Sequence, residues 1–83
     1  MPSSQAPSEL VYVLKITHKH GTDVIVCRTE EEAQTALFEY VSEWWGDEMS
    51  GKRMPADHKK AISLYFKSVE YEYWEIGPTY IRP

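Results

Sequence analysis

The chain has 83 residues, of which 13 are acidic and 9 are basic, and its formal net charge is -4. This length provides one hydrophobic core and excludes a second domain, because single domains use roughly 50–200 residues. The excess of acid argues against non-specific nucleic-acid binding, which depends on clustered Lys and Arg, and the single cysteine excludes an internal disulfide. No apolar run reaches the roughly 20 residues that cross a bilayer and no signal peptide is recognisable, so we expect a cytoplasmic protein.

Residues 1–8 are mostly Pro, Ser, Gln and Ala, and we expect them to be a disordered leader before a domain over residues 9–77. Two runs rich in β-branched residues follow, over 10–17 and 23–28, and predict a β-hairpin. A three-residue loop ending at Gly21 would pair Ile16 with Val24. This register predicts a core-facing side made of Tyr12, Leu14, Ile16, Val24 and Val26, and a mixed outer side made of Val11, Val13, Lys15, Ile25 and Cys27.

A helix is predicted to begin at Thr29, whose hydroxyl can accept from the amide of Glu32 while the Glu32 carboxylate reaches back to the Thr29 amide. Gly46 is expected to end this helix. Apolar residues recur every three or four positions and predict one buried stripe, composed of Ala33, Ala36, Leu37, Tyr40, Val41 and Trp44. Phe38 and Trp45 are expected at the margin of that stripe.

A polar loop leads to a second helix, predicted over about residues 56–67, whose inward side chains are His58, Ile62, Tyr65 and Phe66. Residues 69–73 alternate as a strand, with a bulge or an end near Tyr73-Trp74. Gly77-Pro78 should break the strand and leave residues 78–83 as a C-terminal tail.

The order β-β-α-α-β predicts an α+β fold, a small three-stranded sheet with two helices on one face. The pattern does not decide whether the third strand lies beside the first or the second. A domain this small buries a modest share of its surface, so a homodimer formed through the mixed sheet face or a sheet edge stays open.

His18 and His20 are the pair of residues that suggests a metal site, but zinc needs at least three protein ligands. Cys27 lies at the far end of the predicted hairpin, so Asp23 or His58 would have to join them. Cys27 follows Val-Ile-Val and is interpreted as a strand residue, not a reactive thiol. The carboxylates lie at a helix cap, in a polar loop or on the outward phase of the last strand. We therefore expect no catalytic residues and no cofactor.

Aromatic and thioether side chains beside carboxylates are typical of protein interfaces. We expect a partner-binding surface at the margin of the first helix and the following loop, made of Phe38, Glu39, Glu43, Trp45, Asp47, Glu48 and Met49. In an alternative, Trp45 only caps the helix end against Met49 or Met54. An acidic surface would suit a basic partner, including a nucleic-acid-binding surface of a host complex. Weak nucleic-acid binding through Lys52-Arg53 and Lys59-Lys60 is a further alternative, as is metal binding by His18 and His20.

Four segments resemble a scattered group of small bacterial and phage proteins without an assigned activity. They are Tyr12 to Asp23 with its His-Lys-His-Gly turn, Arg28-Thr-Glu-Glu-Glu-Ala33, Trp44-Trp45, and Tyr71 to Ile76. The resemblance covers about residues 10–76 and implies no functional residue. In size and acidity the chain is also similar to phage inhibitors of host defence, including anti-CRISPR proteins. We therefore expect a non-enzymatic protein-binding module, and an inhibitor of a host defence complex, encoded by a phage or mobile element, is the form this similarity suggests.

Overall fold

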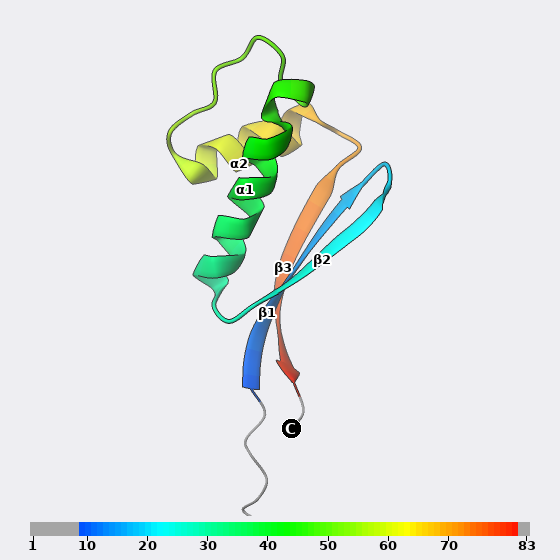
Figure 1. The fold of residues 1–83 in the computed structure, drawn as a ribbon, viewed down its shortest axis with the longest axis vertical. Helices are drawn as coiled ribbons and strands as arrows, with labels where there is room; N and C mark the ends of the chain where they lie inside the picture. Colours follow the sequence, from blue (N-terminus) through cyan, green and yellow to red (C-terminus); the bar gives the residue numbers. More distant parts are fainter. Residues whose placement is uncertain (1–8, 82–83) are drawn as a thin grey trace, which may run out of the picture.

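The computed structural model describes residues 9–81, which form an α+β fold of three antiparallel strands and two helices, as predicted. In chain order the elements are β1 (Glu9–His18), β2 (Gly21–Cys27), α1 (Glu30–Glu48), α2 (His58–Ser68) and β3 (Tyr73–Ile81). The sheet order is β2-β1-β3, so the third strand pairs with the first. Both helices lie to the same side of the twisted sheet, and α2 crosses α1 (Figure 1). The predicted leader and the last two residues of the predicted tail lie outside the described residues.

The hairpin has a two-residue turn, and the predicted register is wrong by one position. Gly21 has a positive φ of 135°, which favours glycine but lies far from the left-handed helical conformation of a bulge glycine, and it joins β2 and pairs with His18. Leu14 consequently pairs with Ile25 and not with Val26. Because side chains alternate along a strand, this shift turns Val24 and Val26 outward, each 57% exposed, and brings Ile25 and Cys27 to the helix side.

Helix α1 starts as predicted but runs further. The Thr29 hydroxyl accepts from the Glu32 amide at 3.0 Å, whereas the Glu32 carboxylate accepts from the amide of Arg28 and not from that of Thr29. The predicted end at Gly46 is wrong, because Gly46 does not adopt a positive φ and the helix continues to Glu48. The buried side chains follow a strict four-residue spacing, Ala33, Leu37, Val41, Trp45 and Met49.

The two tryptophans exchange the places that the sequence pattern predicts for them. Trp45 is 7% exposed and packs in the core, while Trp44 is 39% exposed. The predicted stripe differs from the observed one by one position at the C-terminal end of α1, because the helix continues past Gly46 to Glu48 and Met49 is buried. The additional helical turn places Met49 above Trp45 and fixes the phase of both tryptophans.

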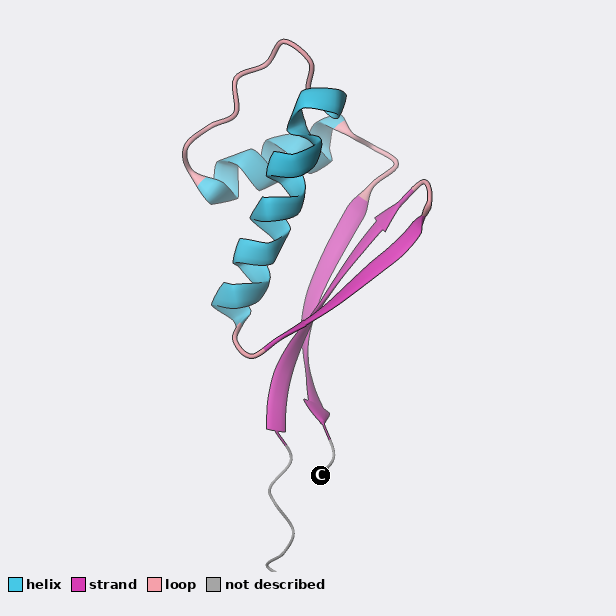
Figure 2. Ribbon diagram, viewed as in Figure 1, coloured by secondary structure: helices cyan, strands magenta, loops and turns pink. Residues whose placement is uncertain are grey.

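Helix α2 begins two residues later than predicted, with the Asp57 carboxylate accepting from the Lys60 amide at 3.1 Å. The prediction that His58 points inward is wrong, because it is the exposed first residue of the helix, and its ring stacks on Phe38 with centroids 3.7 Å apart. A long connection joins the two helices (Figure 2). Ile62 and Tyr65 are buried, as expected, and anchor α2 to the core.

Strand β3 starts and ends later than predicted. Val69 closes α2, so the strand begins at Tyr73, and its pairing with β1 runs without a bulge from Tyr73 to Ile81. The expected bulge near Tyr73-Trp74 and the expected break at Gly77-Pro78 are both wrong, and residues 78–81 belong to the strand. Pro78 is tolerated because β3 is an edge strand, where a missing N–H can face solvent.

The core lies between the sheet and the helices. Its fully buried large side chains are Leu14, Ile16, Leu37, Val41 and Tyr65, contributed by β1, α1 and α2. Within residues 9–81 there is no helix of the length and apolarity needed to cross a membrane.

Candidate functional site

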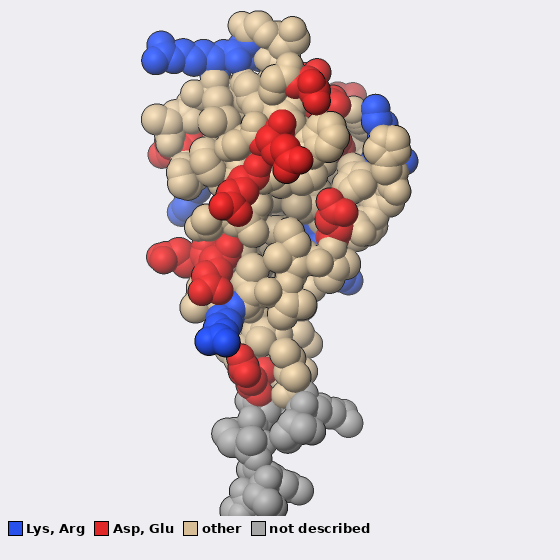
Figure 3. Space-filling model, viewed as in Figure 1, with Lys and Arg blue, Asp and Glu red and all other residues tan. Residues whose placement is uncertain are grey.

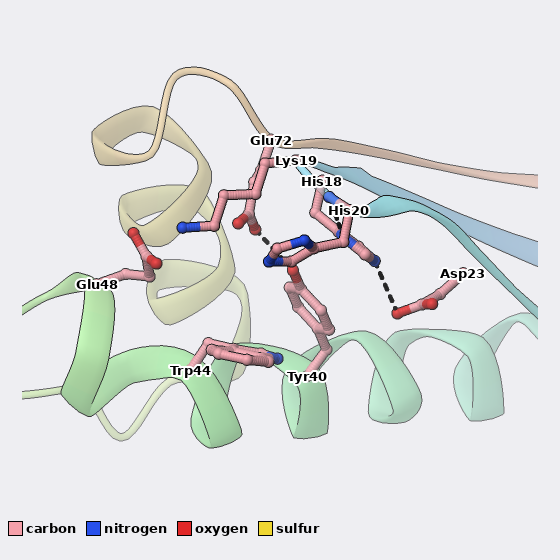
Figure 4. A pocket seen from close by; sticks show the side chains of 8 residues that line it. All are labelled: His18, Lys19, His20, Asp23, Tyr40, Trp44, Glu48 and Glu72. Atoms are coloured by element: carbon pink, nitrogen blue, oxygen red, sulfur yellow. Dashed lines mark hydrogen bonds and ion pairs between the residues drawn. The ribbon is translucent and has the colours of Figure 1, made fainter.

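A pocket of about 240 Å³ opens between the tip of the hairpin and the C-terminal half of α1 (Figure 4). The hairpin, α1 and the segment before β3 contribute to it. Its lining combines carboxylates, aromatic rings, imidazoles and one amine: His18, Lys19, His20, Asp23, Tyr40, Trp44, Glu48 and Glu72. Segments distant in sequence thus meet in one cavity.

Glu72 is the buried charge of this pocket, at 6% exposure. The hydroxyl of Tyr40 donates to its Oε1 at 2.7 Å, and the hydroxyl of Tyr65 donates to the same oxygen at 3.0 Å. No residue in 9–81 donates a hydrogen bond to Oε2 or forms an ion pair with this carboxylate. The fold therefore fixes Oε1 of Glu72, while Oε2 is free to accept a hydrogen bond from a group that enters the pocket.

The two phenols are fixed as hydrogen-bond donors. Burial, and then the hydrogen bond to Glu72, raise the pKa of Tyr40 and the pKa of Tyr65 well above the ordinary value for tyrosine. Both hydroxyls stay protonated at neutral pH, so they orient the Glu72 carboxylate and supply no base.

Aromatic rings line the pocket on the α1 side. The Tyr40 ring lies 6.5 Å from the ring of Trp44 and is stacked near the ring of His18 at 6.4 Å. Phe66 supports Tyr40 from the other side, with centroids 6.3 Å apart. Ring faces attract cations, so this wall favours a positively charged group beside the carboxylates.

The His18 ring is held by contacts within the hairpin. His18 Nδ1 accepts from the backbone N–H of His20 at 3.2 Å, and His18 Nε2 lies 3.3 Å from Asp23 Oδ2. An Nδ1 that accepts leaves the ring proton on Nε2, where it faces the carboxylate. Among residues 9–81, no group of three His, Cys, Asp or Glu side chains is placed to hold a metal ion. The alternative of a metal site at His18 and His20 therefore has no third ligand here.

Lys19 extends its amine over the pocket (Figure 4) but forms no ion pair with a carboxylate of the described chain. Asp23, Glu48 and Glu72 line the same pocket, so carboxylates outnumber amines by three to one. Glu48 also accepts from the Tyr71 hydroxyl at 2.8 Å. The electrostatic balance favours an incoming cation over an anion.

The residues predicted to bind a partner are divided by the structure. Trp45 and Met49, 7% and 3% exposed, are core residues, and the Trp45 indole donates to the Lys52 carbonyl at 2.8 Å, so the expectation that they lie at the surface is wrong. Phe38 is half-buried against His58. The exposed members Glu39, Glu43 and Asp47 lie on α1, where Figure 3 shows acidic side chains following the helix, and Glu48 lines the pocket.

Sequence reasoning missed the residues that build the pocket wall, Tyr40, Trp44 and Glu72. Tyr40 and Trp44 were assigned to the core stripe, and Glu72 to the outward phase of a strand that begins only at Tyr73. The helix end and the strand start would have been needed to find them.

Comparisons of the chain with protein-family models, with curated proteins and with solved structures gave no match. They assign no family, and the resemblance to small bacterial and phage proteins stays a prediction.

Proposed function

We propose that this protein is a non-enzymatic binding module that recognises a basic segment of a partner protein and receives one lysine or arginine side chain in the pocket. The observation that carries the proposal is Glu72, a buried carboxylate with one oxygen held by two phenols and the other without a donor within residues 9–81. No buried polar side-chain atom within residues 9–81 lacks a partner, so the free oxygen of Glu72 is open to the pocket, where an ammonium or guanidinium group would pair with it.

The pocket wall supports the same occupant. A cation that reaches Glu72 would pass beside the rings of Tyr40 and Trp44, which attract positive charge through their faces. Glu48 at the pocket edge offers a further acceptor. A hydrogen bond between the cation and one of these carboxylates is charge-assisted and about twice as strong as a neutral one.

The acidic side of α1 would align the rest of the basic segment. Glu39, Glu43 and Asp47 are exposed on the helix that leads to the pocket. Complementary charge of this kind raises the rate of association and disfavours wrong partners. If the basic segment belongs to a nucleic-acid-binding surface of a host complex, its occupation would inhibit that complex, which is the phage-inhibitor role that the resemblance suggests.

Fluorescence anisotropy with short labelled peptides tests the proposal. The Glu72→Gln variant keeps an oxygen for the two phenols but removes the charge, and we expect it to weaken binding of an arginine- or lysine-containing peptide at least tenfold. Lys19→Met removes the resident amine and should strengthen binding. Glu30→Gln removes an equal charge at the opposite end of α1 and serves as the matched control, with a change of less than about twofold. Equal losses in Glu72→Gln and Glu30→Gln would refute the pocket and leave only general charge attraction.

A further inference from the structure

The face of the sheet turned away from the helices has a ridge and a hollow in one row. Val13 pairs with Val26 on β2 and with Gly77 on β3, so these three residues lie side by side across the sheet. Val26 and its neighbour Val24 form the ridge on edge strand β2, each 57% exposed. Gly77 has no side chain, and a Cβ there would meet no atom within 4 Å.

The hollow above Gly77 has a volume of about 270 Å³ and is lined by Val13, Lys15, Glu75, Gly77, Pro78 and Thr79. Its charged residues are Lys15 on β1 and Glu75 on β3, which are opposite each other in the strand register. The hollow therefore has no net charge, whereas the chain as a whole carries a net charge of -4. A basic partner gains little electrostatic attraction at this hollow, whereas a second copy of the chain meets no net electrostatic repulsion.

We infer that this face is covered by a second copy of the chain, with Val26 of each copy seated in the hollow above Gly77 of the other. A two-fold axis parallel to the strands and above β1 places β2 of one copy over β3 of the other, because the axis exchanges the two edges. The same operation places Lys15 of each copy opposite Lys15 of the other, with each lysine between Glu75 of its own copy and Glu75 of the other. The contact is self-complementary in shape and in charge, as a closed dimer requires.

The size of the face determines how tight this dimer is. Three strands at about 4.8 Å spacing and nine residues at about 3.3 Å cover roughly 14 Å by 30 Å. This is below the roughly 800 Å² per partner of a standard stable interface, so the dimer is weak and its population rises over roughly 10 µM to 1 mM. Helix α1, which contributes residues to the pocket, lies on the other side of the sheet (Figure 1), so the pocket stays open in the dimer.

Analytical ultracentrifugation of the full chain over that concentration range tests the dimer. Gly77→Leu fills the hollow, and Val26→Asp places a charge on the ridge, so each should weaken self-association at least tenfold. Ser63→Leu and Thr35→Asp introduce the same two side chains at exposed positions of α2 and α1 and should change self-association less than twofold. Circular dichroism verifies that each variant is folded. A wild-type chain that stays monomeric at 1 mM, or controls that weaken the dimer equally, would overturn the inference.

The geometry is tested with two single-cysteine chains in a Cys27→Ser background, Val26→Cys and Gly77→Cys. Mixed and treated with a short bismaleimide, they should link to each other at least tenfold faster than either links to itself. Faster self-linking of Val26→Cys would indicate edge-to-edge pairing of β2 and refute the face-to-face arrangement. Because no peptide is involved, these outcomes are independent of the proposed function.

Discussion

Replacing Trp44 and Trp45 by alanine, one at a time, distinguishes the observed burial of Trp45 from the burial of Trp44 that the sequence pattern predicts. Trp45 is 7% exposed, and its indole N–H donates to the Lys52 carbonyl, so Trp45→Ala removes a core ring and leaves that carbonyl without its donor. Large core aromatic residues replaced by alanine typically cost about 3–5 kcal/mol. Trp44 is 39% exposed and lines the pocket, so Trp44→Ala should cost about 1 kcal/mol.

These magnitudes matter because the whole domain is marginally stable. At about 0.05–0.15 kcal/mol per residue, a chain of this length has a free energy of unfolding of about 4–12 kcal/mol. Trp45→Ala should therefore remove about a quarter or more of the stability, and at the low end of that range it would unfold the chain. Trp44→Ala should leave a folded protein that binds basic peptides weakly.

Urea unfolding followed by circular dichroism measures both variants without depending on tryptophan fluorescence. A shift of the midpoint in Trp45→Ala at least twice that in Trp44→Ala agrees with a helix that continues through Gly46 to Glu48. An equal or larger loss in Trp44→Ala would mean that α1 ends at Gly46 and that the assignment of the pocket wall is wrong.

Three further measurements address the interior. Because the pKa values of Tyr40 and Tyr65 are raised in the folded chain, the two phenols stabilise the fold fully below pH of about 10, where tyrosines of an unfolded chain ionise, and this stabilisation is lost as the pH rises further. Absorbance at 295 nm should show Tyr40 and Tyr65 ionising only above pH of about 10. Ionisation of both at about pH 10 in the folded chain would contradict their hydrogen bonds to Glu72. Burial raises the pKa of the Cys27 thiol, so it should react with Ellman's reagent at pH 8 more slowly than free cysteine, and equal rates would refute this. Ile25→Thr should cost at least 1 kcal/mol more than Val26→Thr in urea unfolding, since the observed register turns Ile25 inward, and the reverse order would favour the three-residue turn.

The fold class and the element order could be predicted because they depend on periodicity over many residues. The two β-rich runs, the Thr29 cap and the four-residue apolar spacing of α1 each carry enough signal to survive an error at a single position. The β-β-α-α-β order and the placement of both helices to one side follow from those patterns.

The hairpin register and the end of α1 could not be predicted, because each depends on the backbone of one glycine. Gly21 pairs with His18 as the first residue of β2 where a bulge was expected, and Gly46 is helical where a stop was expected. Each difference moves a neighbouring series of side chains by one position. The first exposes Val24 and Val26, and the second exchanges the tryptophans.

The pocket was less predictable still, since its residues come from segments with no local pattern in common. Tyr40 and Glu72 are 32 positions apart, and the sequence around each residue does not indicate that they form a hydrogen bond. Glu72 was interpreted as an outward strand residue because the start of β3 was placed four residues early. A buried carboxylate of this kind is recognised only once the helices are packed.

The central claim is that the pocket selects a cationic side chain through Glu72, and an NMR titration tests it with two ligands of matched shape. Nα-acetyl-arginine amide should shift the indole N–H signal of Trp44 in a saturable manner, whereas the citrulline analogue, which is neutral and nearly isosteric, should leave that signal in place. In Glu72→Gln the arginine ligand should lose its effect. Similar shifts from both ligands, or an arginine response that survives in Glu72→Gln, would contradict the account.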